Sequence, residues 1–226
     1  MSAPDERLSA TPTTGPDGLG DSPAAGPGGP ADVGGGEAPW IATVDWEDAE
    51  GTLAEAYAWQ AVRLGEPAAF TKLGSLYPDL VFERLRLYKV VEAAPSALSP
   101  LERQLAAFVT SVLNETPHCS SGLTHKLGEL GAPAGLLEEI RRDPFDLTTD
   151  DGRLRTIVGY AASLTSDPGS IDREAIEQLR RVGLSDLDIL DLNNVVAYYN
   201  YINRVANGLG LRTVIPPAHA LNAVPV

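Results

Sequence analysis

Cysteine, methionine and histidine are scarce in this 226-residue sequence, which contains one, one and three of them respectively. A single cysteine excludes a disulfide framework within the chain and makes a cysteine-based zinc site within it untenable. The histidines do not form the H-x-x-x-H pair, with nearby carboxylates, that many catalytic metal sites use. We therefore expect neither a metal nor a cofactor.

Basic residues and long apolar runs are also few. The chain has 17 Lys and Arg against 31 Asp and Glu, a net charge of −14, whereas phosphate binding depends on clustered basic side chains. The acidic residues are spread along the sequence, which favours a solvated surface over an acidic interaction tail. No stretch approaches the roughly 20 apolar residues of a membrane helix, and the N-terminus fits neither a secretory signal nor a transit peptide. These features predict a soluble, cytoplasmic protein that binds neither nucleic acid nor membranes.

Composition divides the chain into three parts. Residues 1–39 hold nine glycines and seven prolines and no aromatic residue, which is typical of a disordered tail. Residues 40–211 carry regular apolar periodicity and are predicted to form one helical domain. Residues 212–226 contain three prolines and no periodicity, so we expect an extended C-terminal arm over the surface.

The strongest start signal of a helix is at Ser99. Ser99 and Glu102 make a capping box, Pro100 suits the first helical position, and an apolar stripe follows to about residue 113. Gln104 lies on the flank of this stripe and is expected to face the interior, while Arg103 faces away. Asn114 to Pro117 break the pattern, and a second helix is predicted from His118 or Cys119 to Gly131.

Helical spacing recurs through the rest of the domain, and no alternating run is long enough for a sheet. A helix capped by Thr148, with Asp151 three residues later, should end near Leu164, and Ser185 should cap a long last helix. That helix carries a polar and aromatic band, which we interpret as serving packing and subunit contact. Its residues are Asn193, Asn194, Tyr198, Asn200, Tyr201, Asn203 and Arg204. The fold class is predicted to be all-α, with further helices over 47–65, 79–94, 133–140 and 172–182.

Three stretches resemble a known family. They are VDWEDAEGTLAEAYAW (44–59), SPLERQLAAFVTSVLNETPHC (99–119) and LSDLDILDLNNVVAYYNYINRVANGLGL (184–211). They are similar to the carboxymuconolactone decarboxylase and alkyl hydroperoxidase D-like family, in its peroxidase-related branch. The resemblance implies an alkyl hydroperoxidase D-like helical bundle, a homo-oligomer, and peroxidase-related oxidoreductase (antioxidant) chemistry on a small-molecule substrate.

The family's redox motif is degenerate in this chain. Redox-active members carry a Cys-x-x-Cys pair, a histidine four residues later, and a relay glutamate on the preceding helix. Here the matching positions hold Thr116, Cys119, Leu123 and Gln104. With one cysteine, no intramolecular disulfide can form, so a single chain cannot carry out the dithiol chemistry of the family.

Cys119 is the candidate nucleophile, because a helix N-terminus favours thiolate over thiol. His118 is adjacent and can polarise the thiol if the turn folds it back, whereas His125 is interpreted as an exposed helix residue. Gln104 and Thr116 can hold a substrate by hydrogen bonds. Three of these residues also have a purely structural interpretation. Cys119 can be a small buried hydrophobic residue, Gln104 can serve packing, and Thr116 can serve the turn before Pro117.

Three functional hypotheses follow. The first is a one-cysteine, thiol-dependent peroxidase in which Cys119 is oxidised and then reduced by an external thiol or a reductase partner. The second is a cofactor-independent, non-redox lyase or isomerase that positions a small organic acid with Gln104, Thr116 and His118. The third is a catalytically silent, oligomeric binding protein.

Overall fold

The computed structural model describes residues 38–215, apart from the side chain of Arg63, and every regular element in that range is helical. The all-α prediction is therefore confirmed for this part of the chain. The predicted disordered tail over 1–39 lies outside the described residues except for its last two. Of the predicted arm over 212–226, only residues 212–215 are described.

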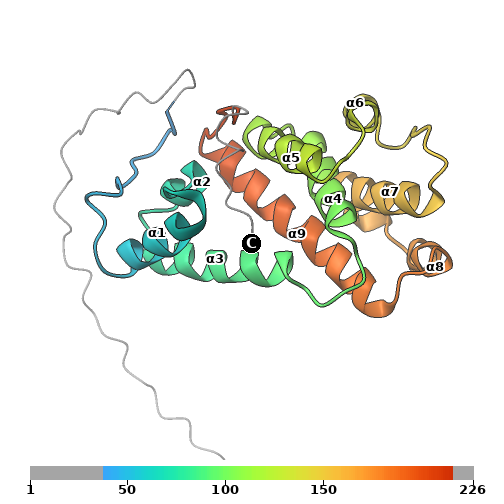
Figure 1. The fold of residues 1–226 in the computed structure, drawn as a ribbon, viewed down its shortest axis with the longest axis horizontal. Coiled ribbons are helices and arrows are strands. Elements are labelled where there is room, and N and C mark those ends of the chain that lie inside the picture. Colours follow the sequence, from blue (N-terminus) through green and yellow to red (C-terminus); the bar gives the residue numbers. More distant parts are fainter. Residues whose placement is uncertain (1–37, 216–226) are drawn as a thin grey trace, which may run out of the picture. The chain divides into compact units, whose positions relative to one another are not determined.

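Nine α-helices and one short 3₁₀ helix follow one another in the described range (Figure 1). In chain order they are α1 (Gly51–Leu64), α2 (Ala69–Leu73), α3 (Pro78–Glu92), α4 (Pro100–Leu113), α5 (Pro117–Glu129), α6 (Ala134–Arg142), α7 (Gly152–Ser166), η1 (Pro168–Ser170), α8 (Arg173–Arg181) and α9 (Asp186–Gly208).

Helix α4 lies at the centre of the core. It contacts α5, α7 and α9, and every residue over 103–111 is buried (Figure 1). Its start is the predicted capping box: Ser99 accepts a bond from the Glu102 backbone, and the Glu102 carboxylate accepts one from the Ser99 backbone. Four polar side chains of α4 are buried with the apolar ones, so their partners must come from α4 itself or from neighbouring helices. They are Arg103, Gln104, Thr110 and Ser111.

The last helix, α9, packs against α3, α4 and α7. Ser185 caps it as predicted, with Asp188 completing a second capping box. The polar band of α9 is used for packing within the chain: Asn114 Nδ2 donates to Asn200 Oδ1 at 2.9 Å, and Tyr160 donates to Asn193 at 2.9 Å. Helix α3 joins α1 to this core through its contact with α9.

Two local predictions were wrong. Thr148 does not cap α7; Asp151 does, accepting bonds from the backbones of Arg153 and Leu154, while the Thr148 hydroxyl donates to Glu139. Arg103 does not face away from the interior. Its Nη2 lies 2.5 Å from Asp191 Oδ2 on α9, and both side chains are more than nine-tenths buried. The Asp191 carboxylate pairs with the Arg103 guanidinium inside the core. The periodicity of α4 alone cannot predict this pair, because Asp191 belongs to α9.

The buried Arg103–Asp191 pair leads to a stability prediction. Arg103→Met removes one charge and leaves Asp191 uncompensated in the core, which is expected to cost about 3–5 kcal/mol in the free energy of unfolding. Urea unfolding measures the change. Arg86→Met, which breaks an exposed pair with Glu83 on α3, is the control and should cost about 0.5 kcal/mol or less. Equal losses in the two variants would contradict this account.

Candidate functional site

Cys119 is the third residue of α5 and is partly buried against the main hydrophobic core. Its helix begins at Pro117, because proline suits the first helical position and the preceding Thr116 is held in a non-helical conformation. The predicted break between α4 and α5 and the position of the cysteine at a helix start are both confirmed.

The protonation of Cys119 differs from the prediction made from its helix position. Burial raises the pKa of the Cys119 thiol to about 11, and the nearby Asn203 amide on α9 opposes this shift only in part. A helix N-terminus favours the thiolate, but here the loss of hydration in the core outweighs that effect. The thiol is therefore held in its protonated form near neutral pH.

His118 turns toward the C-terminal segment. Its Nδ1 lies 3.0 Å from the hydroxyl and 3.2 Å from the carbonyl oxygen of Thr213, and burial lowers the pKa of its ring. His125 is partly buried, not exposed as the sequence indicated, and its Nε2 lies 2.9 Å from the carbonyl oxygen of Ile215. Both histidines, seven residues apart on one face of α5, thus hold the same segment.

Thr116 is buried and serves the turn between α4 and α5. Its hydroxyl donates to the Asn114 carbonyl at 3.3 Å and accepts from Asn207 Nδ2 at 3.0 Å. These bonds occupy the side chain within the protein. The structure accordingly favours the turn role of Thr116 among its predicted roles.

Gln104 is hydrogen-bonded to the carboxylate of Glu92, a residue that the sequence did not single out. Its Nε2 donates to Glu92 at 3.0 Å and 3.2 Å, to the two carboxylate oxygens, and Lys126 Nζ donates to the same carboxylate at 2.7 Å. Three helices, α3, α4 and α5, therefore meet at Glu92, whose side chain is only 14% exposed. The carbonyl oxygen of Gln104 is buried and has no hydrogen-bond partner.

Tyr199 connects this polar group with the cysteine. It is buried on α9, one helical turn before Asn203, and burial raises the pKa of its phenol well above the ordinary value, with electrostatic contributions from Tyr88, Glu92 and Cys119. The Tyr199 phenol therefore lies within electrostatic range of both Cys119 and Glu92. We call Cys119, Tyr199, Glu92, Gln104 and Lys126 the thiol cluster.

The sequence held only a weak signal for the missed members. Glu92 and Lys126 are charged residues of predicted helices, and such residues usually face solvent. Tyr199 fits the apolar periodicity of α9. Only the tertiary packing of α3, α4, α5 and α9 brings them together. Among the residues that the structure describes, no three His, Cys, Asp or Glu side chains are grouped as metal ligands would be.

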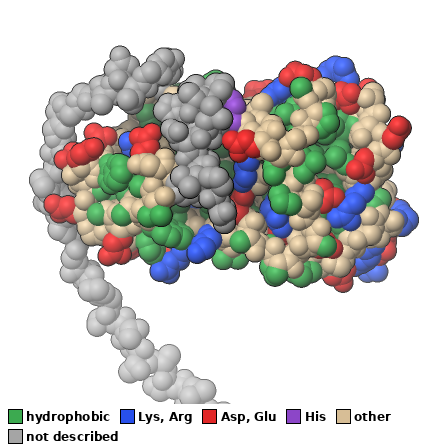
Figure 2. Space-filling view, viewed as in Figure 1, with side chains coloured by type: hydrophobic (Ala, Val, Ile, Leu, Met, Phe, Trp, Pro, Cys, Tyr) green, Lys and Arg blue, Asp and Glu red, His purple; other side chains and the backbone are tan. Residues whose placement is uncertain are grey.

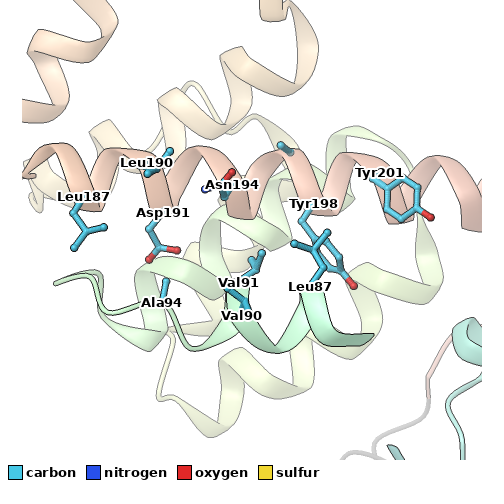
Figure 3. A pocket seen from close by; sticks show the side chains of 11 residues that line it. Leu87, Val90, Val91, Ala94, Leu187, Leu190, Asp191, Asn194, Tyr198 and Tyr201 are labelled. Atoms are coloured by element: carbon cyan, nitrogen blue, oxygen red, sulfur yellow. The ribbon is translucent and has the colours of Figure 1, made fainter. Parts of the chain in front are cut away.

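A groove of about 480 Å³ lies between α3 and α9 (Figure 3). Tyr198, which stacks on Tyr88 and meets Tyr199 edge-on, forms part of its wall. The groove is mostly apolar, and several of its side chains are exposed: Leu87, Val90, Leu187, Leu190 and Tyr201. On the face drawn in Figure 2, acidic and basic side chains are interspersed.

The helical arrangement is the alkyl hydroperoxidase D-like fold, as the resemblance implied. A peroxidase-related protein from Silicibacter sp. TM1040 is 24% identical, with a TM-score of 0.66 over 78% of this chain and 93% of that one. A peroxidase-related protein from Ralstonia eutropha JMP134, described as an alkylhydroperoxidase AhpD core, is 16% identical with a TM-score of 0.71, over 83% of this chain and 98% of that one.

The same fold is found in a debrominase. A variant of the debrominase Bmp8, in which alanine replaces a cysteine, was solved with 2,3,4-tribromopyrrole. It is 16% identical with a TM-score of 0.66, over 84% of this chain and 100% of that one. No protein-family model and no curated protein sequence matches the chain. Within residues 38–215, none of the helices combines the length and apolar character needed to cross a membrane.

The raised pKa of Cys119 gives a pH prediction. Its alkylation by iodoacetamide should rise about tenfold per pH unit up to about pH 11, because only the thiolate reacts. The urea-unfolded chain is the control and should level off near pH 8.5, the ordinary value for cysteine. A plateau of the folded protein at pH 8 to 9 would show that burial does not govern this thiol.

Proposed function

We propose that this chain is a one-cysteine, thiol-dependent peroxidase-like enzyme that acts on a small hydroperoxide and is reduced by an external thiol or a reductase partner. The observation that supports this proposal best is the position of Cys119 at the start of α5, partly buried against the core, where the buried Tyr199 phenol lies within electrostatic range of both the thiol and Glu92. Buried groups of this kind are costly to a fold and are common where chemistry is performed.

The proposed cycle uses one sulfur atom. The Cys119 sulfur attacks the terminal oxygen of a hydroperoxide, the O–O bond breaks, and an alcohol and a cysteine sulfenic acid are formed. One external thiol then displaces water to give a mixed disulfide, and a second thiol releases Cys119 and leaves as the external disulfide. This cycle requires a thiol-rich compartment, so we place the protein in the cytoplasm.

The debrominase supports a small organic substrate for this fold. The variant in which alanine replaces a cysteine was solved in complex with a brominated pyrrole. By analogy, the substrate of this chain is expected to be small, and the analogy rests on the fold alone.

The proposal is tested with Cys119→Ser. Consumption of cumene hydroperoxide, with dithiothreitol as the reductant, should fall at least about 100-fold, because the hydroxyl cannot replace the thiolate as the nucleophile. Ser121→Ala, a change on the same helix at a side chain that bonds the Ile215 backbone, is the matched control and should keep its rate. Unchanged consumption in Cys119→Ser would refute the thiol mechanism.

A second candidate is a catalytically silent binding protein. The raised pKa of the Cys119 thiol and the missing second cysteine both favour it, because they describe an unreactive core residue. It is supported if the folded protein consumes no hydroperoxide in the assay above.

We also propose that two copies of the chain pack through the groove between α3 and α9. The side chains that rim this groove are large, apolar and exposed, as is common where subunits meet. The resemblance to an oligomeric family points the same way.

This interface is tested with Leu190→Asp. Leu190 is 56% exposed, so the change should leave the folded monomer intact while placing a charge in the interface. Light scattering after size-exclusion chromatography should show the mass falling to that of one chain. Leu76→Asp, at a residue 63% exposed and outside the groove, is the control. An oligomer that persists in Leu190→Asp would exclude this interface.

A further inference from the structure

The exposed side chains of α9 form one narrow stripe. Between Leu187 and Arg204 they recur at alternating intervals of three and four residues, and every other residue of this stretch is buried or half-buried. The stripe consists of Leu187, Leu190, Asn194, Ala197, Tyr201 and Arg204. A mean interval of 3.5 residues is the spacing at which one helix packs along another in a coiled coil.

Helix α3 extends this surface across the groove. Leu87 and Val90 are exposed on α3, and both line the groove together with the apolar members of the α9 stripe. Figure 3 shows the two sets of side chains on neighbouring helices. A second helix that packs along the α9 stripe therefore also covers the exposed side chains of α3.

The stripe is balanced about Asn194. Leu187 lies seven residues before it, and Tyr201 lies seven residues after it. In a twofold interface, a residue at the axis meets its own copy, and residues equally far from the axis on either side meet each other. The stripe can thus pair with itself when the two helices run in opposite directions.

We propose that two copies of the chain pair their α9 helices antiparallel about a twofold axis at Asn194, with the α3 helices flanking the pair. This inference rests on the subunit interface proposed above for the groove between α3 and α9, and it specifies the orientation and the central residue of that interface. It does not depend on the chemistry of Cys119.

The charges of α9 favour the antiparallel orientation. In a parallel pair, Arg204 lies opposite the same arginine of the partner subunit, and two like charges that face each other across an interface oppose association. In the antiparallel pair, Arg204 lies beside the first turn of the partner's α9. That turn carries two acidic residues, Asp186 and Asp188.

One buried oxygen at the groove lacks a hydrogen-bond donor. Asp191 lines the groove one turn before Asn194, and its Oδ1 has no hydrogen-bond partner within the part of the chain that the structure describes. A buried acceptor without a donor is destabilising. In the proposed pair, the side-chain amide of Asn194 of the partner subunit supplies donors beside this oxygen. A polar residue within an apolar seam also fixes the register of two helices.

The pairing is tested with cysteines introduced into Cys119→Ser, which has no other thiol. Each variant is treated with a short bismaleimide and resolved on a denaturing gel. Asn194→Cys should give a covalent dimer, because its two copies meet at the axis. Leu187→Cys should remain a single chain, because its two copies are separated by twice seven residues, about 21 Å along the helix axis.

Leu187→Cys combined with Tyr201→Cys in one chain should restore the covalent dimer, because each position faces the other in the partner subunit. Within one chain these two positions lie about 21 Å apart along α9, beyond the reach of the short reagent. Leu76→Cys, at an exposed residue outside the groove, is the control for random collisions and should remain a single chain.

A covalent dimer of Leu187→Cys alone would overturn the antiparallel pairing in favour of a parallel one. An uncross-linked Asn194→Cys would also overturn it. The mass of Leu190→Asp then distinguishes the two proposals: a fall to one chain retains the interface and rejects only the pairing, whereas an unchanged oligomer rejects both. A wild-type protein with the mass of one chain would likewise reject both.

Discussion

The burial of α4 is the constraint on which the rest of the structure depends. Every residue over 103–111 is buried, so the polar side chains on this helix have no water to satisfy them. Thr110 and Ser111 bond to carbonyls one turn back in their own helix. Arg103 and Gln104 have charged partners on other helices, Asp191 of α9 and Glu92 of α3. These partners tie α3 and α9 to the central helix at defined points.

The same constraint explains how the thiol cluster is assembled. Gln104 is buried and draws in Glu92, which in turn pairs with Lys126 of α5, the helix that carries Cys119. The contact of the buried Gln104 with Glu92 thus joins α3 to α4, and the ion pair with Lys126 joins both to the helix of Cys119. Burial also raises the pKa of Cys119, so the thiol is held in its protonated form near neutral pH.

Local sequence signals predicted the local structure well. The capping box at Ser99 and the cap at Ser185 were both predicted from neighbouring residues, and both are formed. The helical class followed from periodicity, and the fold followed from the resemblance. The start of α7 was misplaced because Thr148 and Asp151 both have capping side chains, and the contact of Thr148 with Glu139 on α6 decides between them.

The site was predicted less completely, because its chemistry depends on long-range packing. The helix position of Cys119 predicted a thiolate, but burial against the core has the larger effect, and only the tertiary structure reveals it. Glu92 is separated from Gln104 by a turn between two helices, so no motif spacing connects them. Arg103 was placed on the wrong side for the same reason, since its partner Asp191 comes from the last helix.

Whether Cys119 carries the chemistry is the central question, and trapping its first oxidation product answers it most directly. The full-length protein is treated with one equivalent of cumene hydroperoxide at pH 7 in the presence of dimedone, which reacts with sulfenic acids, and is then analysed by mass spectrometry. The account predicts stoichiometric dimedone labelling of Cys119 in the folded protein. An unlabelled Cys119, with the hydroperoxide left intact, would contradict it.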